Sequence, residues 1–328
     1  MKEHRFPRGL IVLPYAAAVL AAWFGYRQLG PLPSGIPLNR LAWERAFLER
    51  GLPLPPNGPR EGYWGKAKPL ASADPELGWR EVAFRLPGRV DTDALGFQSA
   101  GEPGAARQIL ILGGSVAWGA YASSFGATYF SLLAERLARD RYPARISVLA
   151  TAAWDSENEI AALGGPGLAR RPDLVVFLNG LNDVTDSGLL RRGKSVPRAE
   201  RVGRYLRNME SGRQMAAERR VPAVFCLQPF LLQKRQPSRI EKRIVELSFK
   251  DDYPQEFVRS AYPLVREGLR RVAGPQGAYF IDCSGAFDAE TATTFADIWH
   301  FPDPGHRLLA ECLARDLEPI LAHRGGGS

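Results

Sequence analysis

The chain has 328 residues, of which 45% are hydrophobic and 24% are charged, a composition typical of a globular protein with a substantial core. Its net charge is +8 and its isoelectric point is about 9.6, but acidic residues are interspersed among the basic ones. No basic block with interleaved aromatic residues occurs, so we expect no nucleic-acid partner. A positive surface of this kind instead favours acidic glycans or anionic lipid headgroups.

The N-terminus has the pattern of a membrane-targeting segment. Residues 1–8 carry Lys2, Arg5 and Arg8, and residues 10–26 follow without a charge. As a helix, this uncharged run would be roughly 26 Å long, just short of a typical hydrocarbon core. The pattern is typical of a signal anchor or a cleaved signal peptide, with a buried helix of the domain as the alternative. We expect residues 1–30 to export the chain, either secreted or associated with the inner membrane through residues 10–26.

The three cysteines predict neither a metal site nor a disulfide framework. Their number is odd, and none has the spacing of a metal-ligand pair. Cys226 and Cys283 lie in or beside apolar runs, so we interpret them as small buried residues. Cys312 is the third.

Residues 31–107 predict a Pro/Gly-rich spacer followed by an irregular lead-in. Residues 30–59 are rich in proline and glycine, which is typical of a linker. Residues 61–104 hold aromatic side chains among turn residues without a clear period. At the other end of the chain, we expect residues 323–328 to form a flexible tail.

Residues 108–322 predict an α/β domain. Short apolar runs indicate strands at residues 109–112, 146–149, 174–178, 221–227 and 278–282. Amphipathic segments between and after them indicate helices near residues 128–139, 157–163, 202–219, 253–272 and 304–317. This alternation predicts a three-layer sandwich around a central five-stranded parallel sheet.

Three stretches at the ends of predicted structural elements carry residues suited to chemistry. Ser115 follows the first strand and two glycines, where it serves either as a nucleophile or as a helix N-cap. Asn182 follows the third strand, where its amide is suited to an oxyanion hole or a turn. Asp297 lies three residues before His300, close enough to bind the ring's Nδ1 and leave Nε2 free to accept a proton from a serine. His306 lies inside the last predicted helix, and we interpret it as a packing or capping residue.

Together these stretches resemble the SGNH, or GDSL-like, hydrolase family. Its first block is matched by Gly113-Gly114-Ser115, with glycine in place of the acidic residue; its third by G-L-N-D ending at Asp183; and its fifth by D-x-x-H ending at His300. The resemblance implies a flavodoxin-like fold. It also implies that Ser115 is the nucleophile, that His300 is the base oriented by Asp297, and that Asn182 and the Ser115 backbone N–H are oxyanion donors.

This chain departs from the family's pattern in the second block. The family has a glycine after the second strand, whose N–H also faces the oxyanion. Residues 150–156 contain no glycine, so the resemblance assigns this donor to Ala153, or to Ala152 if the alignment shifts. A backbone donor does not require glycine if the dihedral angles permit another residue.

Gln228 follows the fourth predicted strand and precedes a proline. The segment is similar to one in some exported family members, which makes Gln228 a candidate substrate contact. A turn before the proline is the alternative.

The resemblance implies a serine esterase that needs neither a cofactor nor a metal ion. We expect its substrate to be an ester-bearing small molecule or an acylated glycan, with an O-acetyl or short acyl group on an envelope or extracellular glycan. An O-acyltransferase with the same triad is one alternative. A non-catalytic glycan-binding protein on the same fold is another.

Overall fold

A computed structural model describes residues 71–74, 76–81, 84–86, 90–185, 195–248 and 255–325 of the chain. The chain divides into two units, Met1–Arg50 and Gly51–Ser328, and all of the described residues lie in the second. The predicted export segment, residues 10–26, therefore lies outside the described residues. None of the described helices is long and apolar enough to cross a membrane.

Five parallel strands make up one side of the main sheet and match the five strands predicted from the sequence. They lie in the order β10-β9-β8-β6-β7, which is the strand order of flavodoxin-like folds. Their bounds are Arg107–Gly113 (β6), Ala144–Ala150 (β7), Leu174–Asn179 (β8), Ala223–Leu227 (β9) and Ala278–Asp282 (β10). The predicted α/β fold with a central parallel sheet is confirmed.

The sheet as a whole is larger than predicted, because it has eight strands rather than five. Strand β5 (Gln98–Ala100) pairs antiparallel with β7, and β4 (Val90–Thr92) and β3 (Phe84–Leu86) follow it outward. A separate hairpin is formed by β1 (Ala71–Asp74) and β2 (Gly78–Glu81). The lead-in at residues 31–107 is therefore not irregular throughout. Strands of three or four residues are too short for alternation to reveal them in the sequence.

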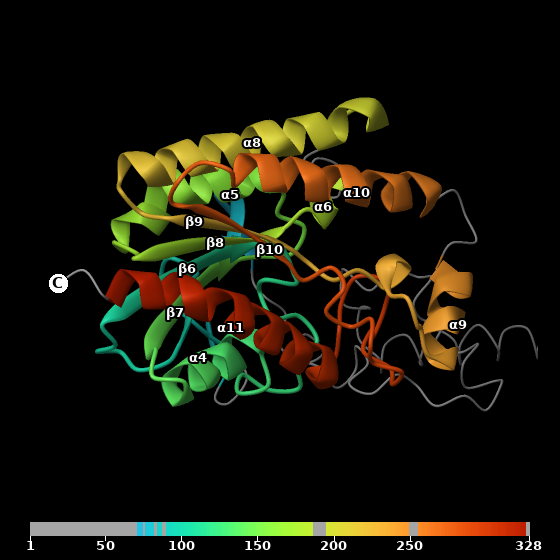
Figure 1. Cartoon of the computed structure of the whole chain (residues 1–328), viewed down its shortest axis with the longest axis horizontal. Helices are drawn as coiled ribbons and strands as arrows, with labels where there is room; N and C mark the ends of the chain where they lie inside the picture. The colour runs from blue at the N-terminus through green and yellow to red at the C-terminus, as the bar shows by residue number, and fades with distance from the viewer. Residues whose placement is uncertain are drawn as a thin grey trace, which may run out of the picture. The chain divides into compact units, whose positions relative to one another are not determined.

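Two layers of helices cover the sheet (Figure 1). Helices α4 (Tyr129–Arg139) and α11 (Asp303–Gly325) pack together on one face. The other face carries α5 (Ser156–Ala162), α8 (Arg198–Glu218) and α10 (Gln255–Val272). Helix α11 extends three residues into the segment predicted as a flexible tail. Every residue of β8 is buried, as expected of a parallel strand covered on both faces.

Shorter helical segments connect these layers. Helix α6 (Leu181–Thr185) follows β8 directly, and α9 (Arg239–Ser248) precedes α10. A π-helical turn, Leu163–Gly167, continues α5, and a 3₁₀ turn, Leu231–Gln233, follows β9. The prediction did not include α6 or α9, since each is short and lies in a segment rich in polar residues.

Two of the three cysteines form a disulfide, a pairing that the sequence left open. Cys283, at the end of β10, is joined to Cys312 in α11, and their Cα atoms are 6.1 Å apart. Cys226 is free and buried, as the apolar run around it indicates. An odd cysteine count excludes neither a single disulfide nor a buried thiol, and the pairing depends on α11 folding back beside β10.

We expect removal of this disulfide to destabilise the domain. The two cysteines are 29 residues apart, and closing a loop of that size restricts the unfolded chain by about 3 to 4 kcal/mol. A Cys283→Ala/Cys312→Ala variant should therefore lose about that much free energy of unfolding in urea denaturation. The unaltered chain should lose a similar amount when dithiothreitol is added, whereas the variant should not respond. Equal denaturation midpoints for the reduced and oxidised chain would contradict the expectation.

Candidate active site

A serine, a histidine and an aspartate meet at the C-terminal edge of the parallel strands. His300 Nε2 lies 2.8 Å from Ser115 Oγ, and His300 Nδ1 lies 2.9 Å from Asp297 Oδ2. Because Nδ1 faces a carboxylate, it carries the proton, and Nε2 is left to accept the serine's hydrogen. The three side chains thus form a continuous chain of hydrogen bonds between residues 185 positions apart in the sequence.

The loop of Asp297 and His300 is shaped by the aspartate itself. Asp297 Oδ1 accepts hydrogen bonds from the backbone N–H groups of Trp299, at 2.8 Å, and His300, at 2.7 Å. The backbone N–H of Ala296 in turn donates to the carbonyl of His300 at 2.9 Å. A spacing of three residues is what allows one carboxylate to bind both the turn and the ring.

A buried ion pair anchors this loop to the segment after β9. Lys234 and Glu241 are both fully buried, with Nζ 2.7 Å from Oε2. Lys234 also donates to the carbonyl of Ala292, while Glu241 accepts from the backbone N–H groups of Thr294 and Phe295. A buried pair is stable only when its remaining donors and acceptors are satisfied, and here residues 292–295, which lead to Asp297, satisfy them.

Ser115 lies on a hydrogen-bonded turn directly after β6. The backbone N–H of Trp118 donates to the carbonyl of Gly114, and that of Ala120 donates to Ser115. Ser115 is half-buried, while residues 116–122 are all buried. The turn therefore presents the serine hydroxyl at the edge of an otherwise closed core.

Asn182, Trp154 and Gly114 make the contact that joins the first three parallel strands. Asn182 Nδ2 donates to the carbonyl of Trp154 at 2.7 Å. A Cβ at position 114 would lie 2.4 Å from the same nitrogen, so only glycine permits this approach. The second N–H of the Asn182 amide has no partner among the described residues and is available to a ligand.

Ala153 adopts the backbone conformation that the family's glycine would favour. Its φ angle is +63°, in the left-handed region where a Cβ is strained. This conformation supports the alignment of Ala153, rather than Ala152, with the second-block glycine. Within the part of the chain that the structure describes, neither its backbone N–H nor that of Ser115 has a hydrogen-bond partner.

A buried polar network around Asp183 holds the neighbouring Asn182 in place. The carboxylate of Asp183 accepts hydrogen bonds from the backbone N–H of Ser156, at 3.0 Å, and from Arg204, at 3.3 Å. Burial, together with the nearby carboxylate of Asp155, raises the pKa of Asp183 to about 7. The network fixes α6 to the start of α5, which holds Asn182 beside Trp154.

A family model described as the GDSL-like lipase/acylhydrolase family matches residues 111–308 of the chain. This range covers more than half of the chain and includes the serine, asparagine, aspartate and histidine described above. The chain belongs to the GDSL-like lipase/acylhydrolase family. As a member of this family, it is an enzyme that hydrolyses ester bonds.

Several solved structures are similar at low sequence identity. Axe2, an acetylxylan esterase from Geobacillus stearothermophilus, is 15% identical, covers 65% of this chain and 95% of its own, and has a TM-score of 0.47. LAE5, an alpha/beta hydrolase enzyme from the metagenome of Lake Arreo in Spain, is 18% identical, covers 65% and 96%, and has a TM-score of 0.49. TesA is 18% identical, covers 65% and 99%, and has a TM-score of 0.46. No curated protein is similar enough to count as a match.

Two other residues singled out in the sequence have defined places in this GDSL-like domain. His306 is fully buried, accepts from the backbone N–H of Tyr129 and faces the carbonyl of Ala120. Burial lowers its pKa to about 4, so it is a neutral packing residue, as interpreted from the sequence. Gln228 lies at the end of β9 and is 5% exposed. Little of its side chain is accessible, and its contact with substrate stays a prediction.

No group of histidine, cysteine, aspartate or glutamate side chains within the described ranges could hold a metal ion. The site's polar groups are instead those of the serine, its hydrogen-bonded histidine and the surrounding amides.

Tyr121 is a site residue that the sequence did not reveal. Its ring stacks on the imidazole of His300, with centroids 4.9 Å apart and planes at 14°. Its φ angle is +75°, a strained value for a residue with a large side chain. Strain of this kind persists where the surrounding structure enforces it. Here the strained backbone places the face of the Tyr121 ring against His300. No sequence pattern signals such a contact, because it depends on the turn and the loop meeting.

We expect Tyr121 to act as a positioning residue for His300. Tyr121→Ala should lower kcat for a small ester by roughly two- to tenfold and leave KM unchanged, given the energy of an aromatic pair. Tyr121→Phe, which keeps the ring, should restore kcat. Both variants should be compared for Tm. A Phe variant as impaired as the Ala variant would show that the hydroxyl, and not the stacked ring, matters.

Proposed function

We propose that this GDSL-family enzyme is a serine esterase in which Ser115 attacks the ester carbonyl and His300 takes its proton. The observation that carries the proposal is the 2.8 Å contact between Ser115 Oγ and His300 Nε2, with Asp297 on the opposite ring nitrogen. Attack gives a tetrahedral intermediate, and its collapse releases the alcohol, which receives the proton from His300. Water activated by the same histidine then hydrolyses the acyl-enzyme.

Three donors are suited to hold the oxyanion of each intermediate. They are the second N–H of the Asn182 amide and the backbone N–H groups of Ser115 and Ala153. The contact between Asn182 and the Trp154 carbonyl supports this role because it fixes the amide before substrate arrives. Donors that need no reorganisation stabilise developing charge most effectively.

We propose an acetyl or other short acyl group on a glycan as the substrate. The side chains that follow the nucleophile are buried, among them Trp118 and Tyr121, and this packing favours a small acyl group. Export to the cell envelope, proposed below, would place acylated glycans within reach of the enzyme.

We further propose that the domain works outside the cytoplasm, secreted or held at the inner membrane through residues 10–26. The uncharged run and its positive flank support export. The disulfide between Cys283 and Cys312 adds support, because structural disulfides persist in oxidising compartments.

Variants of the proposed catalytic residues should lower kcat to different extents. Ser115→Ala and His300→Ala should each lower kcat by something on the order of 10⁵- to 10⁶-fold, since nucleophile and base act as one unit. Their double variant should be barely worse than either single one. Asp297→Ala should cost roughly 10³- to 10⁴-fold, and Asn182→Ala roughly 10²- to 10³-fold. Hydrolysis of p-nitrophenyl esters of increasing chain length gives kcat for each variant.

Labelling with a serine-reactive fluorophosphonate supplies the control, because it should modify the unaltered chain and not Ser115→Ala. Activity that survives Ser115→Ala within tenfold would contradict the mechanism. Acyl release measured with and without a glycan acceptor distinguishes transfer to water from transfer to a sugar hydroxyl.

A reporter that is active only outside the cytoplasm, fused after Ser328, should be active when residues 1–30 are present and inactive when they are deleted. The reason is the charge asymmetry around residues 10–26. A fusion active only with a cytoplasmic reporter would refute export. N-terminal sequencing of the mature chain then separates an anchor from a cleaved signal peptide.

A further inference from the structure

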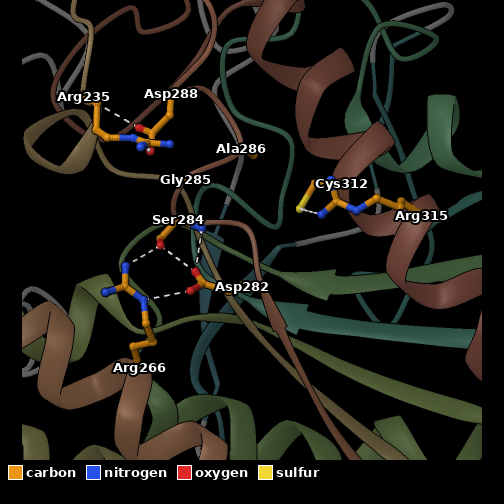
Figure 2. Close-up of a pocket in the computed structure, with 9 residues that line it drawn as sticks. All are labelled: Arg235, Arg266, Asp282, Ser284, Gly285, Ala286, Asp288, Cys312 and Arg315. Carbon is orange, nitrogen blue, oxygen red and sulfur yellow. Dashed lines mark hydrogen bonds and ion pairs between the residues drawn. The ribbon is translucent and has the colours of Figure 1, made fainter.

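A polar cavity lies at the C-terminal end of β10. Its volume is about 360 Å³, and its lining includes Arg235, Arg266, Arg315, Asp282, Asp288 and Cys312. Figure 2 shows Arg266 beside Asp282 on one wall and Arg315 beside Cys312 across from them. We call this cavity the arginine pocket. It contains none of the residues assigned above to catalysis.

All three guanidinium groups of the arginine pocket are held in the same way. Each binds a carboxylate through its Nε atom: Arg235 to Asp288 at 2.7 Å, Arg266 to Asp282 at 2.8 Å and Arg315 to Asp316 at 2.7 Å. Arg315 also donates from Nη2 to Asp316 Oδ2 at 3.0 Å and to Cys312 Sγ at 3.5 Å. A guanidinium has five N–H donors in a rigid fork, so these bonds orient the group and leave the Nη1 donors for a ligand. Asp282, Asp288 and Asp316 balance the charges of the three arginines, so the pocket offers a ligand the terminal N–H donors of its guanidinium groups rather than a net charge.

The walls of the pocket are joined covalently. Cys283 lies between two residues of the pocket wall, Asp282 and Ser284, and its disulfide to Cys312 ties that wall to α11. Arg315 lies one helical turn beyond Cys312 in α11. Arg266 also donates to Ser284 Oγ at 2.7 Å. The arginines from α10 and α11 are therefore held at a set separation before any ligand binds.

The arginine pocket and the nucleophile lie at the same edge of the sheet. Asp282 is in register with Leu227 and, through it, with Asn179, while Gly113 pairs with Leu178. Strands β10 and β6 are separated by β9 and β8, which is three strand spacings or roughly 14 Å. One extended molecule bound along this edge would reach both places.

We propose that the arginine pocket binds an anionic group, a carboxylate or a phosphate, on the saccharide that carries the scissile ester. Guanidinium groups held by aspartates match the planar geometry of a carboxylate and the charge of a phosphate. The proposal rests on the proposed function for its link to catalysis, and it makes the preferred substrate an acylated acidic saccharide.

Binding to the full chain tests the pocket directly. Glucuronate, glucose 6-phosphate and glucose are titrated by calorimetry into the unaltered chain and into Arg235→Gln/Arg315→Gln. These two arginines are exposed and their ion pairs contribute little to folding, so the variant should fold. The control is Arg139→Gln/Arg219→Gln, which removes equal charge from exposed positions where α4 and α8 lead into β7 and β9, at the opposite edge of the sheet.

We expect one or both anions to bind the unaltered chain and the control, with at least about fivefold weaker binding to the pocket variant. Glucose should not bind detectably. Binding of glucuronate alone identifies a carboxylate ligand, and binding of glucose 6-phosphate alone identifies a phosphate ligand. Binding of neither anion, or equal binding to the pocket variant, would overturn the proposal.

Activity separates this proposal from the proposed function. The kcat/KM for an acetylated oligogalacturonate should fall by a similar factor in the pocket variant, while that for an acetylated xylo-oligosaccharide and for p-nitrophenyl acetate stays unchanged. Equal losses on acidic and neutral substrates would overturn the link between pocket and substrate. An unaltered chain that hydrolyses none of these esters would refute the proposed function instead, with the binding result still deciding the pocket.

Discussion

The close approach of the Asn182 amide to the backbone at Gly114 is the constraint on which the rest of the site depends. The amide nitrogen fits because position 114 has no side chain, and it bonds the carbonyl of Trp154. One contact therefore joins the segments that follow β6, β7 and β8. A Cβ at Gly113 would lie 2.3 Å from the carbonyl oxygen of Leu178, so the two consecutive glycines serve the same purpose. They let neighbouring strand ends converge around the serine.

The position of His300 depends on a different kind of support, because its loop has little regular structure. The buried pair of Lys234 and Glu241 holds the N-terminal side of the loop, at residues 292–295. Trp299 stacks on Phe230 with ring centroids 5.4 Å apart. A hydrogen bond from the Ser123 hydroxyl to Asp303 connects the segment after Ser115 to the start of α11. A histidine on an irregular loop is thus placed against Ser115 by polar contacts from several elements.

Three buried acidic residues lie near Asn182, and their charges are partly neutralised. Asp155, Asp183 and Glu159 lie close together, and Arg204 forms ion pairs with the first two. Burial raises the pKa of Glu159 well above its usual range and that of Asp183 to about 7. Protons shared within such a network limit the cost of burying several carboxylates. The network thereby fixes α6 to the start of α5 without placing a large negative charge next to Asn182.

The local sequence alone was sufficient for the α/β fold and its five parallel strands, and the family resemblance implied the flavodoxin-like strand order and the proximity of Ser115, Asn182 and His300. Apolar runs such as residues 174–178 indicate buried strands. The C-terminal ends of parallel strands lie at the same edge of the sheet, independently of the conformation of the loops. Three features depended instead on contacts between distant segments: the stacking of Tyr121 on His300, the disulfide to Cys312 and the arginine pocket. Strands β3 to β5 also escaped prediction, because short edge strands are stabilised by the sheet they join and not by their own period. Hydrophobic periodicity is a property of residues close together in the sequence. The contacts of a side chain with distant residues, in contrast, are determined only by the tertiary structure.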